Sequence, residues 1–143
     1  MLENAIGTRQ LAALQAVTKS LIETSRSVLQ SNDIFDLDEG HSPDEPRLTR
    51  IKVPHIQHSA YRDVMMSTAI TSVVSALIGP DIRLHNSKLN TKAPGGGAAV
   101  EWHQDWAFYP HTNDDLLAIG IMLDDVVQRS GGAVSAFATG RQR

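Results

Sequence analysis

The hydrophobic periodicity of the chain changes at Gly79-Pro80, and this change constrains the fold more than any other feature. Ahead of it, apolar residues recur at helical spacing, which is typical of helices packed against a core. Thr8 can cap a first helix that ends near Ser31-Asn32, and a second helix begins at Ser59 and stops at the glycine-proline pair. The apolar positions of the first helix are Leu11, Leu14, Val17, Leu21, Val28 and Leu29.

Past Pro80 the pattern is that of strands. Apolar residues alternate with polar ones around Ile82, Leu84 and Leu89, as in a half-buried antiparallel sheet. Residues 116–123 form a continuous apolar run, which is typical of a strand covered on both faces. A shorter alternating segment, residues 50–53, precedes the second helix. The order of these elements predicts an α+β fold with two scaffold helices.

Residues 33–50 carry a cluster of acidic side chains and two prolines, and no period of a helix or strand survives there. The carboxylates could be interpreted as a calcium loop, but the regular spacing and closing glutamate of an EF-hand are absent. We therefore expect a solvated acidic loop. Asp124 and Asp125, after the apolar run, are expected to form a turn.

Composition excludes several classes of function. The chain has 143 residues, 41% of them hydrophobic, which predicts a single domain over residues 1–143. A net charge of -3 provides no basic field for nucleic acid or an anionic membrane. The absence of cysteine excludes disulfides, thiol catalysis and cysteine-bound metal sites, and it favours a reducing, cytoplasmic location. No signal peptide and no membrane-spanning run is predicted.

His103 and Asp105 form the most informative motif. Two residues apart on an extended segment, they point to the same side, so an imidazole and a carboxylate can converge on one ion. This is the ligand mixture of the two-histidine, one-carboxylate sites of non-haem Fe(II) oxygenases. Other histidines, His55 and His58, would be ligands only if the fold brought them to His103, and surface or capping roles are the simpler interpretation.

The surroundings of this motif strengthen it. The segments 84–90, 94–97, 101–110 and 116–125 resemble, in order and spacing, the phytanoyl-CoA dioxygenase family, and weaker matches at residues 40–43 and 50–55 extend the resemblance upstream. The family's members are Fe(II)- and 2-oxoglutarate-dependent hydroxylases on a double-stranded β-helix. The resemblance therefore implies the N-terminal half of such a jelly roll or cupin-like fold, with Fe(II), 2-oxoglutarate, O2 and a small-molecule substrate as ligands.

The resemblance also implies roles for polar side chains near the motif. Asn86, Lys88 and Asn90 share one face of a continuous strand; Lys88 and Asn90 would bound the co-substrate pocket and Asn86 the substrate side. The alternative is an amphipathic strand with its polar face in water. Lys52 would contact the co-substrate carboxylate, for which an ammonium is suited, or it is a surface lysine on an edge strand. Tyr109 is predicted to wall the substrate side, although its ring is also a candidate for the core.

One part of the family pattern is missing. The resemblance implies a distal iron-binding histidine and a carboxylate-binding arginine after Val126, but no histidine follows His111. A jelly roll also needs about eight strands, and the sequence predicts roughly four. These departures suggest a truncated domain.

Two functions remain open at this stage. The first is an Fe(II)- and 2-oxoglutarate-dependent dioxygenase that hydroxylates a small organic substrate. The second is an inactive remnant that binds metal weakly or self-associates through exposed strand edges. A zinc hydrolase would need further ligands and a base that the sequence does not identify.

Overall fold

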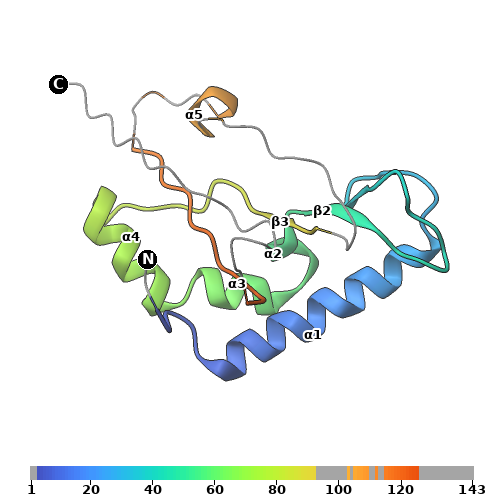
Figure 1. Cartoon of the computed structure of the whole chain (residues 1–143). Coiled ribbons are helices and arrows are strands. Elements are labelled where there is room, and N and C mark those ends of the chain that lie inside the picture. The colour runs from blue at the N-terminus through green and yellow to red at the C-terminus, as the bar shows by residue number, and fades with distance from the viewer. Residues whose placement is uncertain (1–2, 93–102, 104, 110–111, 113–114, 126–143) are drawn as a thin grey trace.

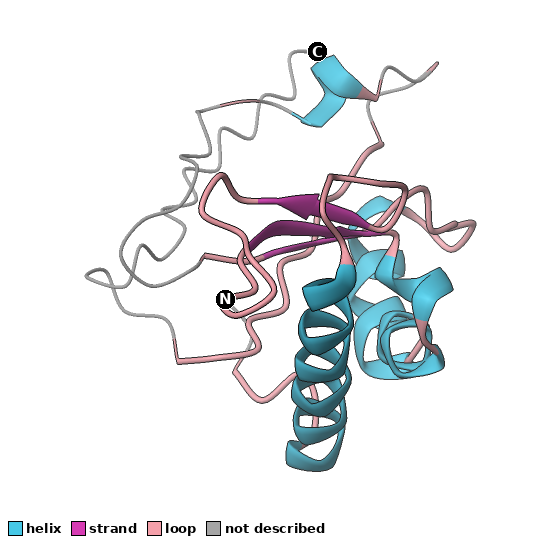
Figure 2. Cartoon of the chain, turned by 90° about the vertical axis from the view of Figure 1, so that its right-hand side faces the viewer, coloured by secondary structure: helices cyan, strands magenta, loops and turns pink. Residues whose placement is uncertain are grey.

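The structure is a computed structural model that describes residues 3–92, 103, 105–109, 112 and 115–125. A long helix and three shorter ones lie on one side of a small antiparallel sheet, and a last helical turn lies on the other side (Figures 1 and 2). The described part of the chain therefore has the predicted α+β class. The jelly roll stays a prediction, because the sheet of the described residues has three strands.

Helix α1, Thr8–Thr24, is the longest element. Its N-cap is Gly7, not Thr8, and the Gln10 side chain accepts a hydrogen bond from the Gly7 N–H at 3.0 Å. The helix ends earlier than its apolar spacing predicts, passing into the short 3-10 helix η1, Ser25–Ser27. The Ser25 hydroxyl donates to the carbonyl of Ile22 at 2.7 Å. Side-chain bonds of this kind compete with helix continuation.

The sheet has the order β1-β2-β3, with antiparallel neighbours. Strand β1 is Phe35–Leu37, β2 is Leu48–Lys52 and β3 is Lys88–Asn90. Strand β2 confirms the predicted alternating segment, but β1 lies inside the segment predicted to be a loop, so that prediction is wrong there. Just before β1 the chain turns at Asn32, whose side-chain Oδ1 accepts hydrogen bonds from the N–H groups of Ile34 and Phe35.

The two faces of this sheet differ in chemistry. Phe35, Ile51 and Leu89 are cross-strand partners on one face, and they pack with Leu21 and Ile22 of α1. The side chains that alternate with them point to the other face. These make up the polar face of the sheet: Asp36, Arg50, Lys52, Lys88 and Asn90. The predicted common face is therefore confirmed for Lys88 and Asn90, but Asn86 precedes β3 and lies outside the strand.

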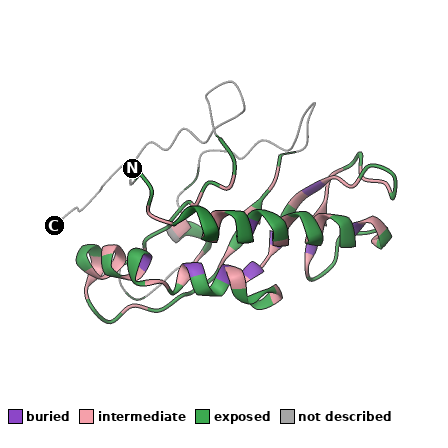
Figure 3. Ribbon diagram, turned by 90° about the horizontal axis from the view of Figure 1, so that it is seen from below, coloured by how far each residue is buried: buried purple, intermediate pink, exposed green. Residues whose placement is uncertain are grey.

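The predicted second helix is two helices, α3, Ser59–Met65, and α4, Thr68–Ile78. A short helix that was not predicted, α2, Pro54–Gln57, precedes them. Met66 and Ser67 separate the last two, because Ser67 adopts the extended backbone of an N-cap and its carbonyl accepts the N–H of Thr71. Tyr61 and Val64 of α3 pack against Leu14 of α1, while the outer side of α1 is exposed (Figure 3).

Two predicted strands are absent from the described residues. Residues 79–87, which include Ile82 and Leu84, and residues 115–125, which include the apolar run, have neither helix nor strand. Ile121 and Leu123 still pack on the cluster around Leu14, and Gln15 Nε2 donates to the Leu123 carbonyl at 2.6 Å. Ile119 and Met122 are exposed, however, and no described residue of this run is fully buried. The prediction of a strand covered on both faces is therefore wrong in the described residues. None of the described helices is long and apolar enough to span a bilayer.

Tyr61 is expected to make the free energy of unfolding decrease at alkaline pH. Its side chain is buried in the core, and burial raises the pKa of its phenol. Thr18 Oγ1 donates to the Leu14 carbonyl, so the Tyr61 hydroxyl donates to Thr18, at 2.7 Å. A raised pKa in the folded state gives stability that is present below the unfolded value of about 10 and is lost as the pH rises through the folded value.

We therefore expect urea unfolding between pH 8 and 11 to show a steeper loss of stability for the natural chain than for Tyr61→Phe. The phenylalanine variant keeps the ring and cannot ionise, so it corrects for the lysines that titrate in the same range. Equal slopes for both proteins would contradict this assignment.

Candidate metal centre

His103 and Asp105 meet at the polar face of the sheet. Asp105 is the first residue of helix α5, Asp105–Phe108, and its Oδ1 lies 3.5 Å from His103 Nε2. The extended backbone that the sequence predicts for this motif is wrong, because Asp105 begins a helical turn, closed by the bond from the Tyr109 N–H to the Asp105 carbonyl at 3.1 Å. His103 therefore meets Asp105 at the first residue of a helix, and not along a strand.

The pair suits one metal ion in distance and in donor type. Two ligands that are each about 2.1 Å from an ion and at a right angle lie roughly 3 Å apart, close to the observed 3.5 Å. The His103 and Asp105 side chains are 33% and 30% exposed, so an ion could reach them. Phe108 places its ring edge-to-face with the His103 imidazole at 5.6 Å. Within the described residues, however, no group of three potential ligands forms. The residues in place therefore fit an Fe(II) ion with two of its three expected protein ligands.

Lys88 is the cation beside this pair. Its Nζ lies 4.0 Å from Asp105 Oδ1. Asn90, two residues on along the same face, accepts a hydrogen bond from Arg50 Nε at 3.3 Å. The sequence predicted both residues as co-substrate contacts. The structure brings Lys88 to Asp105 and pairs Asn90 with Arg50 of the neighbouring strand.

Lys52 has different partners. Its Nζ lies 2.7 Å from Asp36 Oδ1 and donates to the Asn32 carbonyl at 2.8 Å. Asp36 also lies 3.6 Å from Arg50. The sequence predicts an acidic loop at Asp36, although the alternation of Phe35, Asp36 and Leu37 is a strand signal that could have placed it. Lys52 thus shares the polar face with Lys88 but is held by a carboxylate of β1.

The two predicted substrate-side residues contact each other. Asn86 Nδ2 donates to the Tyr109 hydroxyl at 3.4 Å. The same amide accepts the Ser87 N–H at 2.8 Å through its Oδ1, which fixes the amide orientation. His85, which has no predicted role, packs its ring against that of Tyr109 at 5.4 Å and 72°. A polar cluster of imidazole, amide and phenol therefore adjoins α5.

His55 and His58 are not brought to His103. The Nδ1 of His55 lies 2.5 Å from Ser87 Oγ. His58 caps α3, with its Nδ1 accepting the Ala60 N–H at 3.1 Å. The capping role expected for one of these histidines is confirmed, and the other holds the segment that leads into β3.

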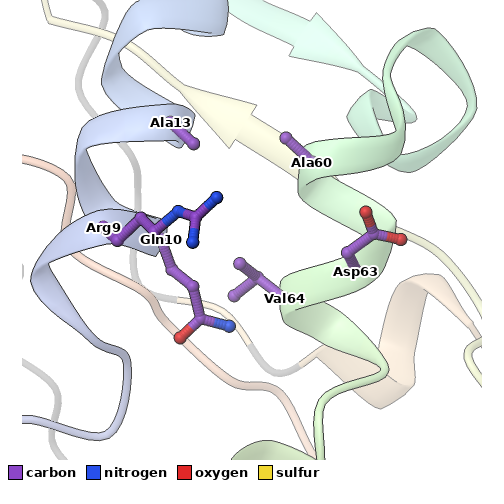
Figure 4. A pocket seen from close by; sticks show the side chains of 6 residues that line it. All are labelled: Arg9, Gln10, Ala13, Ala60, Asp63 and Val64. Atoms are coloured by element: carbon purple, nitrogen blue, oxygen red, sulfur yellow. The ribbon is translucent and has the colours of Figure 1, made fainter.

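A separate pocket of about 360 Å³ lies between α1 and α3 (Figure 4). It is on the helical side of the sheet, away from α5, and it lacks histidine. Its lining is mostly the apolar parts of six side chains: Arg9, Gln10, Ala13, Ala60, Asp63 and Val64. It has no link to the chemistry of His103 and Asp105.

The region after Val126, where the missing distal ligand is expected, lies outside the described residues. The described geometry therefore concerns His103, Asp105 and their neighbours alone.

Comparison with known proteins assigns the chain to a family. The family model described as phytanoyl-CoA dioxygenase matches residues 1–134. The chain is 35% identical over 130 residues to a protein named probable alpha-ketoglutarate-dependent hypophosphite dioxygenase, from Stutzerimonas stutzeri; the match covers 91% of this chain and 45% of that protein.

A second relative is the L-proline trans-4-hydroxylase of Streptomyces griseoviridis, with 36% identity over 67 residues, which is 44% of this chain and 25% of the enzyme. No solved structure gives a significant match. The chain spans less than half the length of either relative. The match over residues 1–134 confirms the resemblance of the sequence motifs, and the chain belongs to the phytanoyl-CoA dioxygenase family.

Proposed function

We propose that this chain forms the proximal half of an Fe(II)- and 2-oxoglutarate-dependent dioxygenase site that hydroxylates a small molecule. The observation that carries the proposal is the convergence of His103 Nε2 and Asp105 Oδ1, with Lys88 4.0 Å from the carboxylate. Iron with 2-oxoglutarate supplies the activation of O2 when both are bound. The donor set, one imidazole and one carboxylate, is of the type that leaves positions open for such ligands.

In this proposal the ion and the co-substrate are bound by different residues. His103 and Asp105 hold the ion, while the charge of Lys88 attracts and orients a carboxylate of the co-substrate. Asn90 bounds the same pocket. Lys52 is a second contact that needs to exchange its present partner, Asp36, for the co-substrate.

The substrate side of the site suits a small polar molecule. Asn86 and Tyr109, with His85 against the phenol ring, offer hydrogen-bonding groups and not a long apolar channel. The names of the two relatives specify hypophosphite and L-proline, and both are small polar compounds. We therefore propose a substrate of this class, without the acyl-CoA that the family's name suggests.

An anaerobic titration of the purified chain with Fe(II) and 2-oxoglutarate tests the proposal. We expect a saturable visible charge-transfer band from the chelated complex. A folded chain, verified by circular dichroism, that shows no band at saturating ligand would reject the site as proposed.

The two lysines give a matched comparison. Lys52 and Lys88 are cross-strand partners, 37% and 38% exposed. A charge-assisted hydrogen bond contributes about 1.5–3 kcal/mol, so Lys88→Met should weaken 2-oxoglutarate binding by about 10- to 150-fold. Lys52→Met should have a smaller effect, because Asp36 already occupies that ammonium. Equal losses, measured by the same titration, would show that Lys52 leaves Asp36 for the co-substrate.

A second candidate function is a metal-binding or interaction module without catalysis. It is favoured by the presence of only two ligands in the described part of the chain. In the described sheet β1 and β3 each pair on one side only, and unpaired strand edges can join a second copy. Sedimentation at increasing protein concentration tests this: a constant monomer mass would reject self-association. A single, partial domain over residues 1–143 and a cytoplasmic location are part of both proposals.

A further inference from the structure

The corner between β2 and α2 is strained at Val53. This residue has φ 41° and ψ 52°, in the left-handed region that β-branched side chains rarely adopt. Such a conformation persists where its surroundings impose it, and it occurs often at functional sites. Pro54, directly after it, is fully buried and begins α2.

Three contacts join this corner to the segment that leads into β3. The Val53 N–H donates to the Ser87 carbonyl at 3.1 Å, and Lys52 is the register partner of Lys88. The third contact is the hydrogen bond between His55 Nδ1 and Ser87 Oγ at 2.5 Å. Ser87 is therefore held by both its backbone and its side chain.

Ser87 in turn contacts Asn86, on the proposed substrate side of the site. Its N–H donates to Asn86 Oδ1, so the Asn86 amide presents Nδ2 to the Tyr109 hydroxyl. On its other side Ser87 is followed by Lys88, which reaches Asp105. The orientation of Asn86 and the approach of Lys88 both depend on the place of Ser87.

We propose that His55 is a positioning residue for the substrate side of this centre, acting through Ser87 on Asn86 and Tyr109. The inference rests on the proposed function for its catalytic meaning, but the coupling itself is a property of the chain. The left-handed conformation of Val53 turns the chain, and two residues later the His55 ring contacts the Ser87 hydroxyl. This assigns His55 a role other than that of a metal ligand.

The two tyrosines of the chain, Tyr61 and Tyr109, make the coupling measurable. Labelling with 3-fluorotyrosine gives two fluorine resonances, which Tyr109→Phe assigns. We expect His55→Ala to shift the Tyr109 resonance by more than its linewidth and to leave that of Tyr61, in the core, unchanged. Ser87→Ala should give the same shift, and the double variant no additional one.

Two variants separate positioning from general loosening. His55→Asn keeps a hydrogen-bonding group near the position of Nδ1 and should restore the natural resonance. His58→Asn removes the neighbouring imidazole but keeps a cap for α3, so it should change neither tyrosine. An unmoved Tyr109 resonance in folded His55→Ala, or an equal change at Tyr61, overturns the proposal.

The charge-transfer band and the fluorine resonances, measured on the same samples, test the proposed function and the role of His55 separately. Absence of the iron charge-transfer band in the natural chain would reject the dioxygenase site and leave the fluorine coupling intact. A band with no fluorine coupling would reject the role of His55 alone.

Discussion

Ile51→Ala is expected to lower the free energy of unfolding by about 2–5 kcal/mol, the usual cost of truncating a buried aliphatic side chain. Ile51 is 0% exposed and lies in the central strand of the described sheet, between Phe35 and Leu89. Its removal leaves a cavity where the sheet meets α1. Domains are stable by only about 5–15 kcal/mol, so this single change would remove a large part of the total.

Urea denaturation measures this loss as a lower midpoint with an unchanged slope. Ile56→Ala is the matched control: the same truncation at a side chain that is 70% exposed should change stability by less than about 0.5 kcal/mol. Similar midpoints for the two variants would mean that the apolar face of the sheet is not the core of the folded chain.

Local signals explain which parts of the fold the sequence predicts. Strand β2 combines alternation with a following proline, and both signals lie within a few residues. The break at Met66-Ser67 has no glycine or proline to mark it, so one helix was predicted in place of two. Strand β1 has three residues, and its pairing depends on β2, beyond an intervening loop. The apolar run at 116–123 predicted a buried strand, but an apolar run does not by itself fix the backbone conformation, and here the chain is irregular and at most half-buried.

In the candidate site, too, contacts between residues close in sequence could be predicted, and contacts between distant segments could not. His103 and Asp105 are near neighbours in sequence, so their convergence could be predicted even though the expected backbone was wrong. The pairing of Lys52 with Asp36 and that of Asn86 with Tyr109 join segments far apart in the chain. Only the folded sheet and the position of α5 bring these partners together, and no spacing in the sequence encodes them.

His103→Ala should weaken Fe(II) binding by more than about 100-fold and abolish the charge-transfer band with 2-oxoglutarate. Changes to residues that merely support a metal ligand cost about 10–100-fold in affinity, and loss of a ligand should exceed that. The effect is large here because the described residues offer a single imidazole beside Asp105. Asp105→Asn should also lose the band, since it removes the anionic donor and leaves Lys88 without its carboxylate.

His58→Asn is the control for the loss of an imidazole, because His58 caps α3 and makes no contact with Asp105 in the described structure. It should retain both the band and the affinity for Fe(II). If His103→Ala kept the band, the ion would be held by residues elsewhere in the chain, and the contact between His103 and Asp105 would have a structural role alone. If it lost the band while Asp105→Asn kept it, the imidazole would be the essential protein ligand and Lys88 with Asp105 a simple ion pair.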